Sequence, residues 1–433
     1  MRNSKTYSLK ELSEFKEKLL HWSQQFYEIV WLDSNEYRHL YGDYDLILAV
    51  EAFTLIKTDE VDAFKKLHEY QNTTNDWIFG YLSYDLKNDT ENLVSQNHDG
   101  LSFPELFFFQ PQRIITLKND QVTFHYLSVI DGEIESDYHQ ILNLKLDTFL
   151  TDLEKGQNLK VQLRLTQKQY LERVQLMQNH ILRGDIYEAN YCQEFFLENV
   201  SLQPVQTFSK LNSISRAPFA SFFRNDDLYA MCSSPERFIK KIGDKVVSQP
   251  IKGTSKRSKD TTIDNALADK LKIDPKERAE NVMIVDLVRN DLSRIAKKSS
   301  VKVEELCKVY PFRQVHQMIS TVSCLVKPEV SPVEVIKNCF PMGSMTGAPK
   351  ISAMEIIEKL EVFKRGLYSG SIGYFTPNGD FDFNVVIRSI LYNESQKYAS
   401  FSVGSAITAK SSPEKEYEEC LLKAKAMREV LLS

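Results

Sequence analysis

Two pairs of glutamates are spaced so that each pair could share one face of a helix. Glu277 and Glu280 lie three residues apart, and Glu416 and Glu419 repeat the spacing near the C-terminus. The apolar run NVMIVDLV follows Glu280, and an uncompensated carboxylate there would be costly. Mg²⁺ binds one or two protein carboxylates and keeps positions for water or substrate, so the pairs are candidate magnesium ligands. An ordinary charged helix face is the alternative.

Two cations could bind an anionic substrate near such a metal. Lys423 lies one helical turn after Glu419, so a substrate carboxylate could bridge metal and lysine, although a surface ion pair with Glu419 explains the spacing equally. Arg388 lies in the predicted strand FDFNVVIRS, among apolar neighbours. An arginine there needs a carboxylate partner, from protein or ligand, and can hold it with two parallel hydrogen bonds.

The segment PMGSMTGAPK, residues 341–350, looks like a phosphate-binding loop but lacks the required spacing. Gly343 and Gly347 are four residues apart and Ala-Pro follows, whereas a P-loop needs Gly-x4-Gly-Lys-Ser/Thr. Its amides, with Ser344 and Thr346, could still receive an anion at a helix start. A purely structural turn is the other interpretation.

Lys252 and Glu236 complete the set of residues that could do chemistry. Lys252, in PIKGT, could lie in a solvated basic loop, or act as a nucleophile if a nearby metal and other cations lowered its pKa. Glu236, in SSPERF, could act as a general acid if burial raised its pKa.

The elements that must position these residues follow from periodicity and capping. Thr166 and Gln169 predict a capping box that opens a helix ending at Gly184. Residues 353–360 show a helical apolar pattern, and Ser412-Pro413 predicts the start of the last helix. Strands are predicted at 77–86, 371–376, 381–392 and 398–408, with a hairpin at Asn378-Gly379. This order predicts a mixed, largely antiparallel α/β architecture.

Length and composition limit the classes of protein. The 433 residues predict one large domain or two interlocked ones, with a boundary in the polar stretch 151–168 that separates regions 1–160 and 161–433. A net charge of −5 disfavours nucleic acid as a partner. The sequence has no signal-like or membrane-length apolar run, and its six cysteines include no C-x-x-C pair. We therefore expect a cytoplasmic protein with reduced thiols.

Eight segments in one order resemble the chorismate-utilising enzymes, which include anthranilate, aminodeoxychorismate, isochorismate and salicylate synthases. The resemblance spans about 165–430, and VWLDS and GYLSYDL extend it more loosely toward the N-terminus. It implies a sandwich of two large antiparallel sheets with helices outside. The eight segments are GDIYEANY, SSPERF, PIKGT, ERAENVMIVDLVRNDLSRIA, GSMTGAPK, SGSIGYF, VVIRS and EKEYEECLLKA.

The resemblance implies roles for the residues singled out above. Glu280 and Glu419 would ligate Mg²⁺ directly, and Glu277 and Glu416 would support it, through water. The metal would hold the ring carboxylate of chorismate with help from the loop at Ser344 and Thr346. The enolpyruvyl carboxylate would be bound by Arg388 and Lys423, Glu236 would protonate the departing C4 hydroxyl, and Gly404 would belong to the strand end that floors the pocket.

Within the family, PIKGT is similar to the aminodeoxychorismate synthase motif, whereas anthranilate synthases usually have PIAGT. The resemblance then implies that Lys252 attacks C2 of chorismate and that ammonia displaces it at C4, giving 4-amino-4-deoxychorismate for 4-aminobenzoate and folate synthesis. It also implies a separate glutaminase subunit as the ammonia source, because the chain has no glutaminase nucleophile elbow. In the family the N-terminal part can bind tryptophan, as an inhibitor or as a structural ligand, and the resemblance leaves open whether VWLDS does so here.

Several alternatives stay open on the sequence alone. Anthranilate synthase component I would eliminate pyruvate and aminate C2, isochorismate or salicylate synthase would use water, and a catalytically silent subunit would use neither. The chain also departs from the family pattern at five positions, where a pocket could be reshaped. These are Glu188 in place of glutamine, Met342 in place of glycine, Gln317 in place of histidine (with His316 one position early), and Ser405 and Ala406 in the strand end.

Overall fold

The computed structural model describes residues 1–37, 41–59, 61–91, 93–146, 159–313 and 315–432. Residues 151–158 of the predicted boundary lie outside the described residues. Across the described ranges, no helix is both long and apolar enough to cross a membrane.

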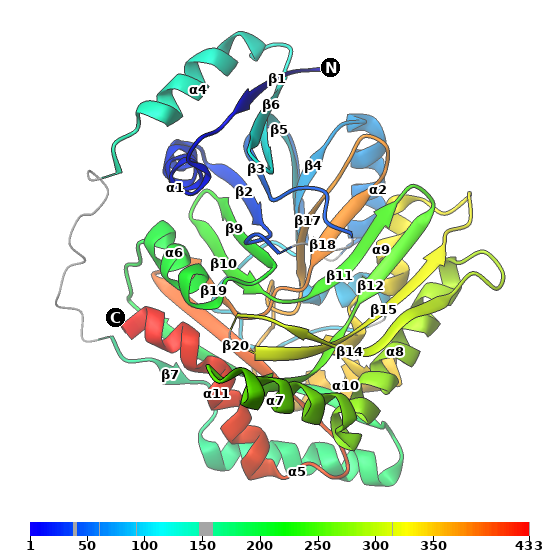
Figure 1. The fold of residues 1–433 in the computed structure, drawn as a ribbon. Coiled ribbons are helices and arrows are strands. Elements are labelled where there is room, and N and C mark those ends of the chain that lie inside the picture. The colour runs from blue at the N-terminus through cyan, green and yellow to red at the C-terminus, as the bar shows by residue number, and fades with distance from the viewer. Residues whose placement is uncertain (38–40, 60, 92, 147–158, 314, 433) are drawn as a thin grey trace.

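The strands form one antiparallel hydrogen-bonded network that bends into two sheets (Figure 1). In the first sheet the neighbours run β1, β6, β5, β3, β2, β9, β10, β19, β20 and β8, with β7 and β16 attached to β8. Their bounds are β1 Arg2–Ser8, β2 Glu28–Asp33, β3 Leu46–Thr58, β5 Leu106–Lys118, β6 Gln121–Leu127, β7 Gln162–Leu163, β8 Glu188–Glu198, β9 Phe219–Asn225, β10 Leu228–Ser234, β16 Gly347–Ala348, β19 Ser389–Asn393 and β20 Tyr398–Ile407.

The second sheet shares β3 and β5 with the first and continues through β4, β17, β18, β11, β12 and β15, with β13 and β14 also paired to β15. Residues 106–109 of β5 pair with β4, whereas residues 113–118 pair with β6. The remaining bounds are β4 Ile78–Leu82, β11 Arg237–Ile242, β12 Lys245–Gln249, β13 Ile251–Lys256, β14 Lys302–Pro311, β15 Val315–Leu325, β17 Ser371–Phe375 and β18 Phe381–Asn384.

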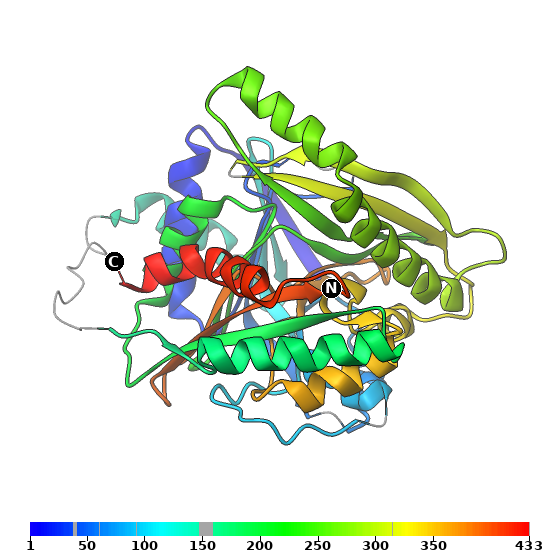
Figure 2. The ribbon, with the colours of Figure 1, turned by 90° about the horizontal axis from the view of Figure 1, so that it is seen from below.

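Helices cover the outer faces of the sheets (Figures 1 and 2). One apolar core lies between the two sheets and includes residues of α8 and α9, and a second lies between the first sheet and α1, α5, α6, α10 and α11. This arrangement confirms the predicted sandwich of antiparallel sheets with outer helices. The helices are α1 Leu12–Trp22, α2 Ala63–Thr74, α3 Lys87–Thr90, α4 Ile134–Asn143, α5 Gln167–Arg183, α6 Pro204–Ser215, α7 Thr261–Ile273, α8 Pro275–Ile295, α9 Pro332–Cys339, α10 Lys350–Leu360 and α11 Pro413–Leu432.

The predicted helices form where their end signals lie. In α5, Thr166 and Gln169 make a reciprocal capping box, and Gly184 ends the helix with φ of 85°. The pattern at 353–360 lies within α10, and α11 begins at Pro413. Local signals sufficed here because caps act over a few residues.

Two predicted strands are shorter than expected. The strand predicted at 77–86 ends at Leu82, and a 3-10 turn follows in which the Tyr84 amide bonds to the Gly366 carbonyl. The strand predicted at 381–392 divides into β18 and β19, and residues 385–388 carry the chain from the second sheet to the first. Arg388 therefore does not lie in a strand, and its φ is 54°. The sequence did not indicate this crossing between the sheets, because β18 and β19 are both buried and form one continuous apolar pattern.

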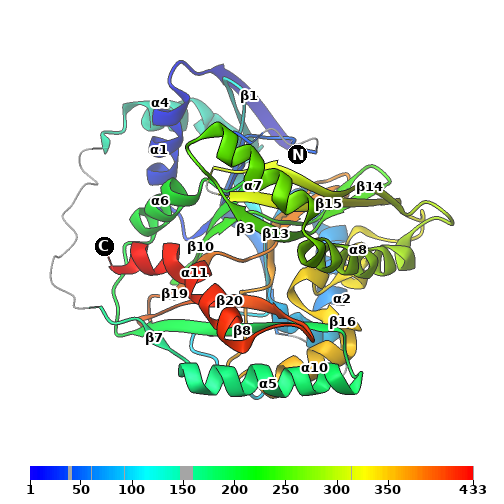
Figure 3. The ribbon, with the colours of Figure 1, turned by 60° about the horizontal axis from the view of Figure 1, so that its bottom comes forward.

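Residues before and after position 160 share both sheets. β2 pairs with β9, and β4 pairs with β17, so neighbouring strands come from segments about 200 and 300 residues apart. The segments that carry the candidate site meet between α8 and β13 on one side and α11, β20 and β8 on the other (Figure 3).

Candidate functional site

The first pair of candidate carboxylates lies in the opening turns of α8. Asp274 caps the helix by accepting hydrogen bonds from the amides of Lys276 and Glu277, at 2.9 and 3.1 Å. Burial raises the pKa of Glu277, and it raises the pKa of Glu280 to about 7 against the opposing effect of Lys252 and Lys276. Glu280 therefore carries a negative charge that its protein neighbours do not fully compensate.

The second pair lies in the opening turns of α11. Glu416 is buried and accepts a hydrogen bond from the hydroxyl of Ser405 on β20. Glu419 pairs with Lys423 at 2.7 Å, and Lys423 also donates to the carbonyl of Gly404 at 2.8 Å. Burial raises the pKa of Glu419, but Lys423 and two more distant lysines outweigh it, so that this pKa is lowered.

All four carboxylates converge electrostatically on Lys276. Burial lowers the pKa of this lysine, but the charges of Glu280, Glu416, Glu277 and Glu419 outweigh burial and raise it. The Lys276 ammonium lies 3.7 Å from Glu280. Among the described residues, no three His, Cys, Asp or Glu side chains stand close enough to hold a metal ion. The donor set nevertheless fits Mg²⁺ in kind, because it consists of carboxylates and the charge of Glu280 is not fully compensated by its protein neighbours.

Lys252 is aimed by a bulge in β13. Pairing with β15 shifts register between Ile251 and Thr254, and Gly253 within this bulge has φ of 97°, which favours glycine. The side-chain amide of Asn281, a buried residue of α8, donates to the Lys252 carbonyl at 3.2 Å. A helix and a sheet irregularity thus fix the direction of this side chain.

The surroundings of Lys252 differ from the expected ones. The side chain is 13% exposed, which excludes a solvated loop, and its ammonium lies 3.2 Å from Glu188. Burial lowers its pKa, but Glu188, Glu280 and Glu236 outweigh burial and raise it. The protein groups around this lysine are therefore carboxylates instead of the expected cations, and the effect of a bound metal on its pKa stays a prediction.

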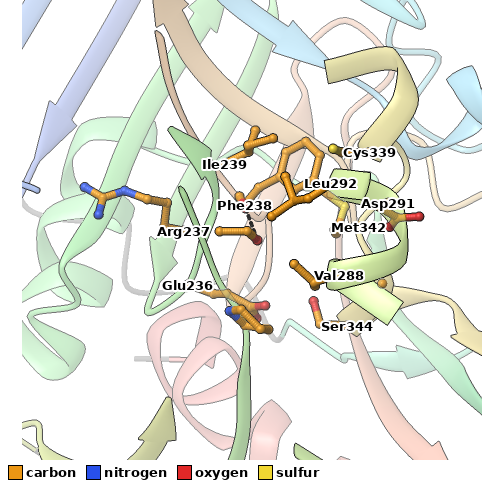
Figure 4. A pocket seen from close by; sticks show the side chains of 13 residues that line it. Glu236, Arg237, Phe238, Ile239, Val288, Asp291, Leu292, Cys339, Met342 and Ser344 are labelled. Carbon is orange, nitrogen blue, oxygen red and sulfur yellow. Dashed lines mark hydrogen bonds between the residues drawn. The ribbon is translucent and has the colours of Figure 1, made fainter. Parts of the chain in front are cut away.

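Glu236 is buried in the connection between β10 and β11. Burial raises its pKa to about 7, while Ser344, Lys252 and the amide of Ile251 lower it. The Ser344 hydroxyl faces this carboxyl (Figure 4) and is the first of the groups that lower its pKa. Beside them is a cavity of about 20 Å³, closed by Val288 and Leu292 of α8, with room for about one water molecule. A carboxyl that is half protonated near pH 7 can donate a proton.

The loop at 343–346 packs tightly between α8 and β8. A Cβ on Gly343 would lie 2.8 Å from Leu287, and one on Gly347 would lie 2.1 Å from the Glu188 carbonyl. Thr346 donates its hydroxyl to the carbonyls of Met342 and Gly343, at 3.3 and 3.2 Å. Ser344 is buried without such a partner, so of the two hydroxyls it is the one free to receive a ligand.

Arg388 presents a free guanidinium. Among the described residues its side chain has no hydrogen-bond or ion-pair partner, and burial lowers its pKa. Its carbonyl accepts a hydrogen bond from the Ser233 amide of β10, which helps fix the crossing segment. An unpaired, largely buried cation is a ready receptor for a carboxylate.

Four of the five departures from the family pattern occupy buried positions, whereas Ala406 is partly exposed. Gln317 leaves its side-chain oxygen without a partner, whereas His316 bonds to Asp264 at 3.0 Å. Met342 is buried and lines the cavity beside Glu236. Ser405 holds Glu416, and a Cβ on the preceding Gly404 would lie 2.6 Å from Asn190.

Three residues with a part in the site were not assigned roles by the sequence. Glu188 bonds to Lys252, Asn281 holds the Lys252 backbone, and Lys276 faces the four glutamates. Glu188 could have been recognised because it is a charged residue at the start of the buried strand β8. The other two depend on how α8 faces β13, which no local pattern encodes.

The chain is similar to several known proteins. The sequence pattern of a family described as chorismate binding enzyme matches residues 27–429. The probable chloroplastic aminodeoxychorismate synthase of Oryza sativa is 33% identical over 81% of this chain and 43% of its own length. Aminodeoxychorismate synthase component 1 of Bacillus subtilis is 32% identical over 84% of this chain and 78% of its own length. The chain thus spans less than half of the rice relative.

A solved structure shares the fold. Anthranilate synthase component I of Streptococcus pneumoniae superposes with a TM-score of 0.74 and 25% identity, covering 90% of this chain and 94% of that one. The two-sheet arrangement is therefore found in a solved relative as well.

Proposed function

Because the chain belongs to the family of chorismate binding enzymes, we propose that it is the component that converts chorismate and ammonia to 4-amino-4-deoxychorismate. Lys252 is the observation that carries the proposal. Its amine lies in a buried site with Glu236, whose pKa is lowered by both Ser344 and Lys252. The names of the rice and Bacillus relatives support the same activity.

The reaction follows from the roles of two side chains. The neutral Lys252 amine attacks C2 of chorismate while Glu236 gives its proton to the C4 hydroxyl, which leaves as water. Ammonia then attacks C4 and expels Lys252 as a free amine, and the enolpyruvyl group is retained. Displacement by an enzyme amine divides one difficult substitution into two easier ones.

In the proposed complex, chorismate is bound by hydrogen-bond donors that lack a protein partner or can exchange one for the substrate. Arg388 and Lys423 bind the enolpyruvyl carboxylate, and Lys423 exchanges its bond to Glu419 for one to the ligand. Ser344 faces the ring carboxylate, and Thr346 supports the loop that carries it. Gly404 has no side chain, which leaves space for the ring above the end of β20. Charge-assisted hydrogen bonds of this kind are about twice as strong as neutral ones.

Mg²⁺ is the cofactor that we propose. When bound, it would neutralise the ring carboxylate against the protein charge. Glu280 and Glu419 would hold it directly, and Glu277 and Glu416 would support it through water. Its support is the four carboxylates around Lys276 and the raised pKa of Glu280.

The wider setting is also a proposal. Ammonia would come from a separate glutaminase subunit, and the product would serve 4-aminobenzoate and folate synthesis. The six cysteines are unpaired thiols, which suits a reducing cytoplasm. Tryptophan would bind in the N-terminal region beside β2, where Asp33, Ser34 and Tyr374 line a cavity of about 80 Å³ that must widen to admit an indole ring.

A product assay tests the activity. Purified protein is incubated with chorismate, Mg²⁺ and ammonium at alkaline pH, and products are identified by mass spectrometry beside Lys252→Ala. We expect 4-amino-4-deoxychorismate from the wild type and none from the variant.

Other products would redirect the proposal. Anthranilate with pyruvate would assign the anthranilate synthase reaction, and isochorismate would assign the reaction with water. Unchanged chorismate, with ammonium supplied, would indicate a subunit that is silent by itself.

A further inference from the structure

We infer that Glu188 is the proton acceptor for Lys252 in this chain. The inference rests on the proposed function, because it concerns how the attacking amine becomes neutral. A lysine attacks carbon only as a free amine, so one proton must leave its ammonium before the first bond forms.

The contact between the two side chains is short and shielded. The Lys252 ammonium donates to Glu188 Oε1 at 3.2 Å, and Glu188 is 1% exposed. The other carboxylate oxygen, Oε2, has no partner among the described residues. That oxygen has free lone pairs, so the carboxylate can accept a proton without breaking another hydrogen bond.

Both side chains are fixed by the backbone around them. Glu188 and Ala189 pair with Ala348 and Gly347, so the loop at 343–346 buttresses the start of β8. The close approach at Gly347 admits no side chain. Lys252 is held from the opposite side by the β13 bulge and by Asn281. The pair is therefore organised before substrate arrives.

The other carboxylates near Lys252 have competing tasks. Glu236 must hold a proton for the C4 hydroxyl, and Glu280, Glu277 and Glu419 belong to the proposed metal set. Among the described residues, Glu188 alone hydrogen-bonds to the Lys252 ammonium. Water could not easily replace it, because the side chains of both partners are largely buried.

The proton balance closes over the two displacements. Lys252 gives one proton to Glu188 and attacks C2 as the neutral amine, forming a secondary ammonium. The C4–oxygen bond breaks, and the oxygen leaves as water with the proton from Glu236. Ammonia then forms the C4–nitrogen bond as the C2–nitrogen bond to Lys252 breaks, and Lys252 leaves as the free amine. Glu188 returns its proton to Lys252, and the new C4 ammonium gives one proton to the Glu236 carboxylate.

The test measures the covalent step separately from the whole reaction. Without ammonia, chorismate should load Lys252, and intact-protein mass spectrometry follows the adduct. We expect Glu188→Gln to slow loading by about 10²-fold or more, the range of general acid–base catalysis, while KM for chorismate changes little. Glu188→Asp, which keeps the carboxylate, should retain more of the rate than Glu188→Gln.

The matched control is Glu194→Gln on the same strand. Glu194 is also a buried carboxylate with a cationic partner, Arg164 at 2.8 Å, so it reports the general effect of removing such a charge. Loading of Glu188→Gln at the wild-type rate, or faster than Glu188→Asp, would overturn the inference. If the wild type forms neither adduct nor 4-amino-4-deoxychorismate, the proposed function itself fails.

Discussion

At the scale of single residues, charge and burial act against each other in the site. Burial alone would make Lys252 neutral and Glu236 protonated. Three carboxylates reverse the effect for Lys252, whereas a single lysine and two weak donors leave Glu236 with a pKa of about 7. In the proposed reaction the two groups have different tasks, Lys252 as a nucleophile that needs a proton acceptor and Glu236 as an acid.

Glu236→Gln should lower kcat by about 10² to 10⁴-fold, because the amide cannot give a proton to the leaving hydroxyl. In the wild type the acidic form of Glu236 predominates below its pKa of about 7, so this group's contribution declines as pH rises through that value. The pH dependence of kcat/KM in wild type and variant measures both effects. A variant with an unchanged rate and profile would remove Glu236 from the acid role.

Arg388→Lys should raise KM for chorismate by about tenfold or more, with a smaller effect on kcat. A lysine offers one bond where arginine offers two parallel ones, and a hydrogen bond to a charged group contributes about 1.5–3 kcal/mol. Steady-state kinetics give the two constants, and thermal unfolding checks the fold. An unaltered KM would show that another cation binds the carboxylate.

At the scale of elements, two short segments position the candidate reacting groups. The two-residue strand β16 fixes the start of β8, and a bulge in β13 aims Lys252. Both depend on glycine, at Gly347 for close approach and at Gly253 for positive φ. These elements are therefore where a small change should reach the chemistry.

Gly347→Ala should reduce activity more than it reduces overall stability. Its Cβ would lie 2.1 Å from the Glu188 carbonyl, so β16 must separate from β8 and release the loop that carries Ser344. Gly132→Ala is the control: like Gly347 it has no positive φ, but nothing lies within 4 Å of its Cβ, and it lies in the turn before α4. Product formation and melting temperature are compared for both variants. Equal losses of activity would contradict the argument from close approach.

At the scale of the whole molecule, the site exists because two sheets and two distant helices meet. α8 and α11 are separated by more than a hundred residues, yet their glutamates act on one lysine. Residues before position 160 supply strands to both sheets, and β2 and β4 pair directly with strands from the second part of the chain.

Mg²⁺ should raise the melting temperature of the wild type, since a ligand at about 100 times its Kd stabilises the folded state by about 2.7 kcal/mol. Glu280→Gln should weaken this effect. Without metal, the raised pKa of Glu280, about 7, makes stability depend on pH. The native state keeps a proton on Glu280 that the unfolded state releases above the ordinary pKa of a glutamate. Stability from this group therefore falls as pH rises from about 4.5 to 7.

Thermal unfolding with and without Mg²⁺, at pH 5.5 and 8, measures both parts of that prediction. Glu280→Gln without metal should be less sensitive to the change of pH than the wild type. A wild type whose melting temperature ignores Mg²⁺ would leave the four glutamates without a metal role.

A chain beginning at residue 161 should not fold by itself. It would lack β2, β3, β4 and β5, which would leave β9 and β17 with unpaired edges and expose the core between the sheets. Circular dichroism and limited proteolysis of the fragment test this expectation, with the full chain as the control. A fragment that unfolds cooperatively would show instead that the second region is an independent unit.

The sequence by itself determined the helices, the motifs and the kind of chemistry. Capping at Thr166 and Gly184 acts over a few residues, and the i, i+3 spacing of Glu277 and Glu280 needs only a helix. The order of eight segments identified the family, and the sandwich followed from that resemblance.

Only the tertiary structure decided what surrounds each reacting group. Arg388 left its predicted strand because the chain crosses between sheets there, and Lys252 proved to face Glu188 and other carboxylates instead of cations. The physical reason is range: capping and periodicity are local, whereas burial and charge depend on which segments meet. Glu188 and Lys252 are 64 positions apart and are brought together by sheet pairing and the packing of α8, which the sequence neighbours of neither residue specify.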